Sequence, residues 1–181
     1  MLLEALKSSL LLVDMQQRLL PVMNNPQALL ARAGIVLKAA TELGLPITIS
    51  EQYPKGLGHT ETALLGNAAV VLEKLSFSCW RDDALKTRLI ELHESGRPLV
   101  IVAGIEAHVC VLQTCLDLIA AGFGVFAVTD AMSSRQPSSS QLAFERMRSA
   151  GVQMVNAEMV VFELLEQAGS PAFRQLSALI R

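Results

Sequence analysis

Six short apolar runs, each separated from the next by a stretch with helical periodicity, constrain the fold of this chain more than any other feature. The runs are residues 9–13, 46–50, 69–72, 99–103, 125–129 and 152–155. Helical patterns occupy residues 26–43, 82–95, 107–121, 138–150, 160–167 and 171–180. Continuously apolar strands that alternate with helices are typical of a parallel sheet covered on both faces. We therefore predict a single α/β domain, residues 1–181, with three Rossmann-like α/β/α layers and a six-stranded, mainly parallel sheet.

Charge and hydropathy exclude several classes of function. The formal net charge is −2 and no block of basic residues occurs, so binding to nucleic acid or to an anionic membrane has no electrostatic support. The mean hydropathy of +0.41 is high, but no apolar run approaches the roughly 18 residues of a membrane-spanning helix. We expect the surplus hydrophobicity to lie in a buried sheet and in a subunit interface, and the apolar segment 159–165 indicates a homo-oligomer.

The cysteine count and the N-terminal segment bear on the compartment. The chain has three cysteines, an odd number, and its first residues lack a basic leader and a small-residue cleavage site. Free thiols are typical of a reducing compartment, so we expect a cytoplasmic protein.

Polar and reactive side chains follow several predicted strands, at the point where each strand ends. Asp14 follows the first strand, Lys74 the third, and Cys110 the fourth. Further polar residues follow the second and fifth strands: Glu51, Gln52, Tyr53 and Asp130. Ligands of parallel sheets bind beyond the carboxyl ends of the strands. An acid, a base and a thiol are therefore expected to meet at one edge.

Cys110 lies in or near the first turn of the helix predicted from residue 107. Outward-pointing N–H groups and the helix dipole at such a start predict a lowered thiol pKa. The same N–H groups can stabilise a developing oxyanion. The alternative is that Cys110 is a small core residue, which is the role we expect for Cys79 and Cys115.

Asp14, Lys74 and Cys110 together suit nucleophilic attack on a carbonyl group. Asp14 would accept the thiol proton, and Lys74 would keep the aspartate ionised and stabilise the thiolate. Attack by Cys110 would give a thioester, which water then hydrolyses. The alternatives are that Asp14 caps a turn and that Lys74 is a surface lysine.

Six further residues are candidates for the wall of a small-molecule substrate pocket. They are Gln16, Gln52, Tyr53, Phe77, Trp80 and His108. The alternative is the start of a loop for Gln16, core packing for Phe77 and Trp80, and the role of a rival base for His108. The three histidines have no metal-ligand spacing, and the chain has neither a phosphate-binding loop nor a dinucleotide fingerprint. We therefore expect no metal and no cofactor.

Several segments resemble the isochorismatase-like superfamily of cysteine hydrolases, which includes nicotinamidases and N-carbamoylsarcosine amidases. The segments are 11–16, 51–58, 73–78, 104–111 and 128–131, in the order of the family. The resemblance implies a six-stranded parallel sheet and a catalytic triad of Asp14, Lys74 and Cys110. It also implies a cis peptide between Ile105 and Glu106, which would direct the amides of Glu106 and Cys110 at the oxyanion.

The chain departs from the nicotinamidase pattern at two places. Glu51, Gln52 and Tyr53 replace the metal-binding Asp-x-His, and Glu106 stands where a small residue is common. The first departure argues against a zinc site. Cys110 favours cleavage of a C–N bond in a small amide or related acyl compound over the family's vinyl-ether chemistry.

Two hypotheses of other classes stay open. One is a catalytically silent binding or scaffold protein with the same fold. The other is a thiol redox sensor, which an exposed Cys79 near Cys110 would favour.

Overall fold

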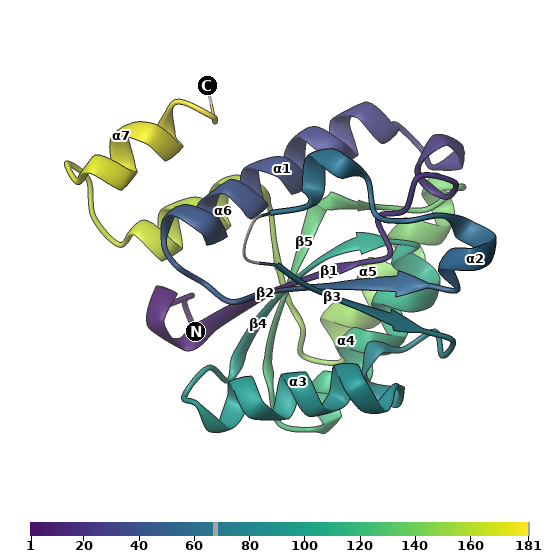
Figure 1. The fold of residues 1–181 in the computed structure, drawn as a ribbon. Helices are drawn as coiled ribbons and strands as arrows, with labels where there is room; N and C mark the ends of the chain where they lie inside the picture. The colour runs from purple at the N-terminus through teal and green to yellow at the C-terminus, as the bar shows by residue number, and fades with distance from the viewer. Residues whose placement is uncertain (67–68, 181) are drawn as a thin grey trace.

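The computed structural model describes residues 1–66 and 69–180, arranged as helices on both faces of a central twisted sheet (Figure 1). The strands are β1 (Ser8–Val13), β2 (Ile47–Gln52), β3 (Ala69–Lys74), β4 (Leu99–Ile105), β5 (Gly124–Ser133) and β6 (Gln153–Val155). They lie in the order β3-β2-β1-β4-β5-β6, and every neighbouring pair is parallel. The predicted three-layer fold is confirmed.

Helices connect the strands and cover the two faces of the sheet. They are α1 (Pro26–Glu42), α2 (Pro54–Leu57), α3 (Asp83–Glu94), α4 (Leu112–Ala120), α5 (Pro137–Ser149), α6 (Ala157–Leu165) and α7 (Pro171–Ser177). Short 3-10 helices occupy Ala5–Lys7, Leu20–Val22, Thr62–Leu64 and Cys79–Arg81, and a π-helix occupies Ala107–Val111. None of the helices in the described ranges has the length and apolarity to cross a membrane.

Alternation along β1 shows how the apolar strands divide between two cores. Leu10 and Leu12 pack into one hydrophobic cluster with residues of α1 and α6. Leu11 and Val13 pack into the other, with residues of α3, α4 and α5. Successive side chains of a strand point to opposite faces, so a strand buried on both sides must be apolar throughout. This burial explains why the sequence shows continuous runs.

Several element boundaries differ from the sequence prediction by a few residues, as in β3, β4 and α6, and three further differences bear on the candidate site. β2 continues to Gln52, because Glu51 and Gln52 pair with Glu73 and Lys74 of β3. β5 continues to Ser133, so Asp130 lies inside this strand rather than after it. The first turn of the helix predicted from residue 107 is a π-helix, and α4 begins only at Leu112. The predicted strands are too short because a search for apolar runs does not detect polar residues at the end of a strand.

Asp130 has a structural role in the fold. Its Oδ1 accepts a hydrogen bond of 2.8 Å from the backbone N–H of Ala157, the first residue of α6. Its Oδ2 lies 3.6 Å from Arg32 Nε of α1. A carboxylate at a helix start satisfies a free N–H group and interacts favourably with the helix dipole. Asp130 therefore fastens α6 to the sheet.

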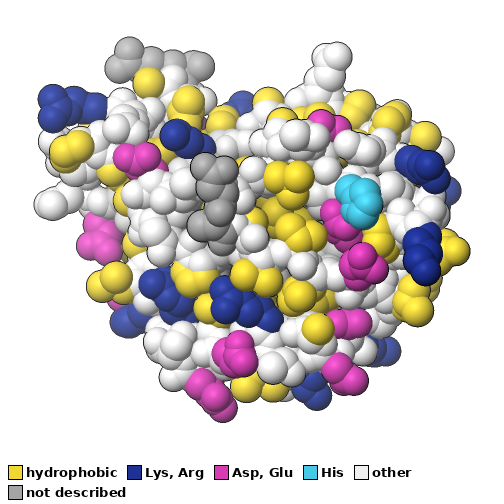
Figure 2. All heavy atoms as spheres, in the orientation of Figure 1, with side chains coloured by type: hydrophobic (Ala, Val, Ile, Leu, Met, Phe, Trp, Pro, Cys, Tyr) yellow, Lys and Arg dark blue, Asp and Glu magenta, His cyan; other side chains and the backbone are white. Residues whose placement is uncertain are grey.

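The apolar segment 159–165 lies mostly inside the chain's own core. Val160, Val161, Leu164 and Leu165 are buried, and the hydrophobic side chains exposed here are Met159 and Phe162. Much of the surplus hydrophobicity of this segment therefore packs α6 against α1 and α7. Figure 2 shows hydrophobic and charged side chains of both signs interspersed on the face that it presents. The homo-oligomer stays a prediction.

Candidate active site

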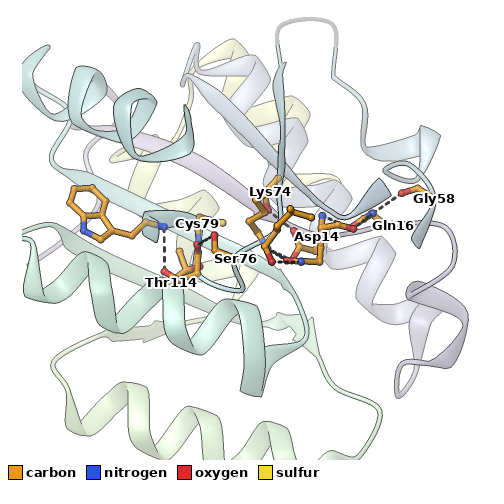
Figure 3. A network of polar contacts seen from close by, with 12 residues as sticks. Asp14, Gln16, Gly58, Lys74, Ser76, Cys79 and Thr114 are labelled. Atoms are coloured by element: carbon orange, nitrogen blue, oxygen red, sulfur yellow. Dashed lines mark hydrogen bonds and ion pairs between the residues drawn. The ribbon is translucent and has the colours of Figure 1, made fainter. Parts of the chain in front are cut away.

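Asp14 and Lys74 form a buried ion pair at the carboxyl ends of β1 and β3. Lys74 Nζ donates to Asp14 Oδ2 at 2.7 Å, and neither side chain is exposed to solvent. Asp14 has a left-handed backbone, with φ of 52°, directly after the last residue of β1. In Figure 3 the two side chains point toward one another across β2, the strand between them.

β2 contributes two further polar side chains to this cluster. Ser50 Oγ donates to Asp14 Oδ1 at 2.7 Å, and Lys74 Nζ also donates to Gln52 Oε1 at 2.7 Å. Residues two apart on a strand share a face, which brings Ser50 and Gln52 to the ion pair together. The sequence prediction placed Gln52 in a pocket wall and missed Ser50, because Ser50 reads as the polar end of a strand.

The end of β4 brings Cys110 to the same cluster. Gly104 has a φ of +136°, and a Cβ at this position would collide with the Val13 backbone, so β4 approaches β1 closely here. The peptide bond between Ile105 and Glu106 is cis. The π-helix follows, and its Cys110 thiol lies close enough to the Asp14 carboxylate for each group to shift the pKa of the other, with 7% of the residue exposed. The structure thus brings Asp14, Lys74 and Cys110 together.

Burial dominates the electrostatics of this cluster. Burial raises the pKa of Asp14, and the opposing charge and hydrogen bond of Lys74 do not cancel the shift. Burial lowers the pKa of Lys74, but the negative charge of Asp14, its hydrogen bond and the nearby Cys79 and Cys110 thiols together outweigh burial, and the net shift is upward. Asp14 is therefore more basic than a surface aspartate, which suits a proton acceptor.

The thiol pKa differs from the sequence expectation. Burial raises the pKa of Cys110, and the negative charge of Asp14 raises it further, while the positive charge of Lys74 opposes both. The expectation of a lowered pKa considered the helix start alone and omitted desolvation, so it is wrong for the resting site. Cys110 holds its proton until a reaction removes it.

Cys79 lies beside the ion pair, although the sequence favours a packing role for it. Its thiol is fully buried and lies near Ser50, Asp14 and Lys74, and burial raises its pKa to about 11. The Cys79 backbone N–H donates to Thr114 Oγ1 at 2.9 Å, which ties its turn to α4 (Figure 3). In the sequence, the one feature that could have indicated this location is that Cys79 follows Lys74 by five residues. Because Cys79 is buried, the exposure that favours a redox sensor is missing.

Of the aromatic pocket candidates, two are exposed and one packs into the protein. Tyr53 and Phe77 are both more than half exposed. Tyr53 lines a cavity of about 340 Å³ at the ends of β2 and β3, together with Lys74 and Leu75. Trp80 instead packs edge-on against Phe123, with ring centroids 5.5 Å apart. Trp80 is therefore placed by core packing.

His108 and Glu106 contact the segment that follows β5. His108 Nδ1 lies 2.9 Å from Ser134 Oγ, and His108 also lines a cavity of about 310 Å³ with Arg135. Glu106 Oε2 accepts from both the backbone N–H and Nε of Arg135, each at 3.1 Å. The Glu106 side chain is thus held by Arg135, while its amide lies at the cis peptide.

Gln16 is fully buried and fixes backbone rather than lining a pocket. Its Oε1 accepts from the Gln52 N–H at 2.8 Å, and its Nε2 donates to the Gln52 carbonyl at 3.0 Å. The same Nε2 donates to the Gly58 carbonyl, the contact drawn in Figure 3. Gln16 therefore joins the end of β2 to the loop that follows α2.

Glu51 faces away from the ion pair and is satisfied by protein donors. Its Oε1 accepts from the Thr60 backbone N–H at 2.6 Å and from the Thr60 hydroxyl at 2.8 Å, and its Oε2 lies 3.0 Å from His59 Nδ1. Across residues 1–66 and 69–180, no group of three or more His, Cys, Asp or Glu could hold a metal ion. Glu51 is an anchor for the loop at 59–60.

Comparison with known proteins identifies the family. The isochorismatase domain matches residues 8–159. Isochorismatase domain-containing protein 1 of Salmo salar is 36% identical over 169 residues, covering 93% of this chain and 59% of the relative. The chain thus spans about three fifths of that relative. The secreted isochorismatase effector Isc1 of Phytophthora sojae is 35% identical over 151 residues, covering 81% of this chain and 71% of the effector.

A solved structure agrees with this assignment over nearly the whole chain. The MAR1 ribonuclease of Caenorhabditis elegans has a TM-score of 0.91 and 32% sequence identity, covering 99% of this chain and 92% of that one. The resemblance found in the sequence segments is confirmed. The chain belongs to the isochorismatase family.

Proposed function

We propose that the chain is a metal-independent cysteine hydrolase that cleaves the C–N bond of a small amide or related acyl compound. The observation that carries the proposal is the meeting of Lys74 and Cys110 at one buried carboxylate, that of Asp14. Membership of a hydrolase family supports the reaction class. We propose residues 1–181 as one catalytic domain.

The cluster supplies each proton transfer that amide hydrolysis needs. Cys110 Sγ attacks the carbonyl carbon as its proton passes to Asp14, which forms a tetrahedral oxyanion. The amides of Glu106 and Cys110 stabilise that oxyanion. The intermediate collapses, the C–N bond breaks, and the leaving nitrogen takes the proton from Asp14.

The second half of the reaction releases the acid. Water attacks the thioester carbon and gives a proton to Asp14, which returns it to the Cys110 sulfur as the C–S bond breaks. Lys74 stays protonated throughout, since its raised pKa keeps it cationic. Its charge stabilises the thiolate whenever Asp14 holds the proton.

The residues next to Lys74 suggest a partly apolar substrate. Phe77 and Leu75 are exposed in the segment that follows Lys74, and Tyr53 lines the neighbouring cavity. We propose these residues and His108 as pocket or rim residues. A homo-oligomer and a cytoplasmic location complete the proposal, and both stay predictions.

A second candidate function is a silent binding protein with the same fold. The raised pKa of Cys110 and its near-complete burial favour this candidate, because both reduce the reactivity of a free thiol. A ribonuclease activity, as in the name of the Caenorhabditis elegans protein, has less support for this chain. A formal net charge of −2 gives this chain no overall attraction for a phosphate backbone.

The deciding experiment combines turnover with detection of the acyl-enzyme. A panel of small primary amides and carbamoyl compounds is screened for ammonia release, and the protein is then digested for mass mapping. We expect at least one compound to be hydrolysed and its acyl group to be found on Cys110.

Two variants control the experiment. Cys110→Ala should abolish turnover with the fold retained, whereas Cys115→Ala, a buried thiol outside the ion-pair cluster, should keep it. Unchanged turnover in Cys110→Ala would remove the mechanism. Absence of both turnover and acylation across the panel would favour the binding protein.

A further inference from the structure

We propose that Gln52 is a positioning residue that holds the Lys74 ammonium in its charged form and in place beside Asp14. The contact itself is independent of the reaction. Its chemical consequence, stabilisation of the Cys110 thiolate, rests on the proposed function. The structure supports the assignment through burial, through the fixed orientation of the Gln52 amide, and through the register of β2.

Burial makes a second acceptor for Lys74 necessary. The Lys74 side chain is fully buried, and an ammonium group has three N–H donors. Asp14 Oδ2 accepts from Nζ at 2.7 Å and Gln52 Oε1 accepts from it at the same distance. A buried charge that lacks hydrogen-bond partners is strongly unfavourable. Gln52 therefore stabilises the cation without adding a charge.

The orientation of the Gln52 amide is fixed by its other neighbours. Its Nε2 donates to the Leu75 carbonyl at 2.8 Å. Exchanging the amide oxygen and nitrogen would place NH₂ against the Lys74 ammonium and oxygen against the Leu75 carbonyl, so both contacts would become repulsive. Gln16 holds the Gln52 backbone from both its N–H and its carbonyl. The acceptor is thus presented to Lys74 in one orientation.

The groups around Lys74 explain why its position matters. The titratable groups that face it are Asp14 after β1, Cys79 in the 3-10 helix and Cys110 in the π-helix. The Lys74 charge lowers the pKa of Cys110 against the larger opposing effects of burial and Asp14. Loss or displacement of the cation would leave those effects unopposed and would raise the pKa of Cys110 further. Gln52 therefore acts on Cys110 through Lys74.

Three variants of β2 test the proposal. Gln52→Met keeps the approximate shape and removes the acceptor, whereas Gln52→Glu keeps an acceptor oxygen. Thr48→Val is the matched control, because Thr48 is buried on the same strand and its hydroxyl finds no hydrogen-bond partner among residues 1–66 and 69–180. Circular dichroism checks the fold of each variant.

The first measurement is the titration of Lys74 by NMR of protein labelled with ¹⁵N-lysine. We expect Lys74 of Gln52→Met to lose its proton at a pH at least one unit below wild type, because an acceptor that favours the charged form has been removed. Gln52→Glu should titrate no lower than wild type, and Thr48→Val should match it. Identical titrations in wild type and Gln52→Met would overturn the proposal. If Gln52→Met does not fold, a Gln52→Glu titration below wild type overturns it instead.

The second measurement separates this proposal from the proposed function. Cys110 is alkylated with iodoacetamide across a pH series and the label is located by mass mapping, with buried Cys115 as the internal reference. We expect alkylation of Cys110 in Gln52→Met to be at least tenfold slower at pH 8. A shifted Lys74 titration with unchanged Cys110 alkylation would uphold the positioning of Lys74 by Gln52 and would contradict the role of Lys74 in the cysteine mechanism.

Discussion

Asp14 and Glu51 are two buried carboxylates at the same edge of the sheet, and their pKa values shift in opposite directions. Burial raises the pKa of Asp14 despite the ammonium of Lys74 beside it. Burial also pushes the pKa of Glu51 upward, but hydrogen bonds from Thr60 and His59 together outweigh it and lower the pKa. The two residues therefore hold their protons over different pH ranges.

The difference comes from how much water each carboxylate loses and from what replaces it. Asp14 is enclosed on every side, and a single ammonium and a hydroxyl do not restore its lost solvation. Glu51 accepts a backbone N–H and a hydroxyl from Thr60, and its third partner, the His59 side chain, is 75% exposed. A carboxylate whose partners lie near the surface keeps more of its solvation, so its charged form is less destabilised by burial. Glu51 thus stays ionised as an anchor, while Asp14 can exchange a proton.

Asp14→Ala should have the largest effect, because it removes both the counter-charge and a hydrogen-bond acceptor of a fully buried ammonium and leaves the Ser50 hydroxyl without its acceptor. We expect a loss of about 3–5 kcal/mol in the free energy of unfolding, as for other broken buried ion pairs. Urea unfolding at pH 7 measures it. A loss below about 1 kcal/mol would show that Lys74 is held chiefly by its other contacts.

Glu51→Gln should cost less and should leave the thiol chemistry intact. The variant loses a charged acceptor for Thr60 and His59, so we expect a loss of about 2 kcal/mol. Because Glu51 faces away from the ion pair, the rate of Cys110 alkylation should match wild type. A large fall in that rate would contradict the separation of the two carboxylates.

The pH dependence of stability should carry opposite signs for the two residues. Glu51 has a lowered folded-state pKa, so its stabilisation is complete above its ordinary value of 4.5 and is lost as pH falls through the folded-state pKa. Asp14 has a raised pKa, so its ionisation reduces stability as pH rises above its ordinary value of 3.8.

Urea unfolding between pH 3 and pH 6 tests these signs. The gain in stability with rising pH should be smaller in Glu51→Gln than in wild type, because the variant lacks the group that produces it. Parallel curves for the two proteins would contradict the assignment of a lowered pKa to Glu51.

His59→Ala should have the smallest effect. The imidazole is mostly exposed, and exposed pairs contribute about 0–1 kcal/mol. Thermal unfolding at pH 7 should therefore show a small decrease in midpoint. A decrease as large as that of Glu51→Gln would mean that His59, rather than Thr60, holds the Glu51 carboxylate.

The sequence could predict the fold because both faces of the sheet are covered. Strands such as β1 must then be apolar at every position, which makes them visible as runs. Asp14, Lys74 and Cys110 could be predicted as neighbours because parallel strands end at one edge. That inference needs only the order of elements along the chain and the direction of each strand, whereas the choice of Lys74 as a catalytic residue rests on the family resemblance.

The roles of Ser50, Gln52 and Cys79 could not be predicted in this way. Ser50 and Gln52 reach the ion pair only because β2 lies between β1 and β3 in one particular register. Cys79 reaches it through a 3-10 turn pinned to Thr114. The predicted direction of the Cys110 pKa shift is also wrong, because desolvation depends on tertiary packing, which a local sequence pattern does not show.

The two hydrogen bonds from Gln16 to the Gln52 backbone have a consequence for how the chain must assemble. Shifting a strand by one residue exchanges its two faces. A slip of β2 would bring Glu51 against Lys74, where two carboxylates would compete for one cation, and would move Gln52 out to the loop. Gln16 can make both bonds only when Gln52 is correctly aligned. Gln16 thus stabilises only the correct register of a strand more than thirty residues further along the chain. A shift of one position would place a second carboxylate beside the ion pair.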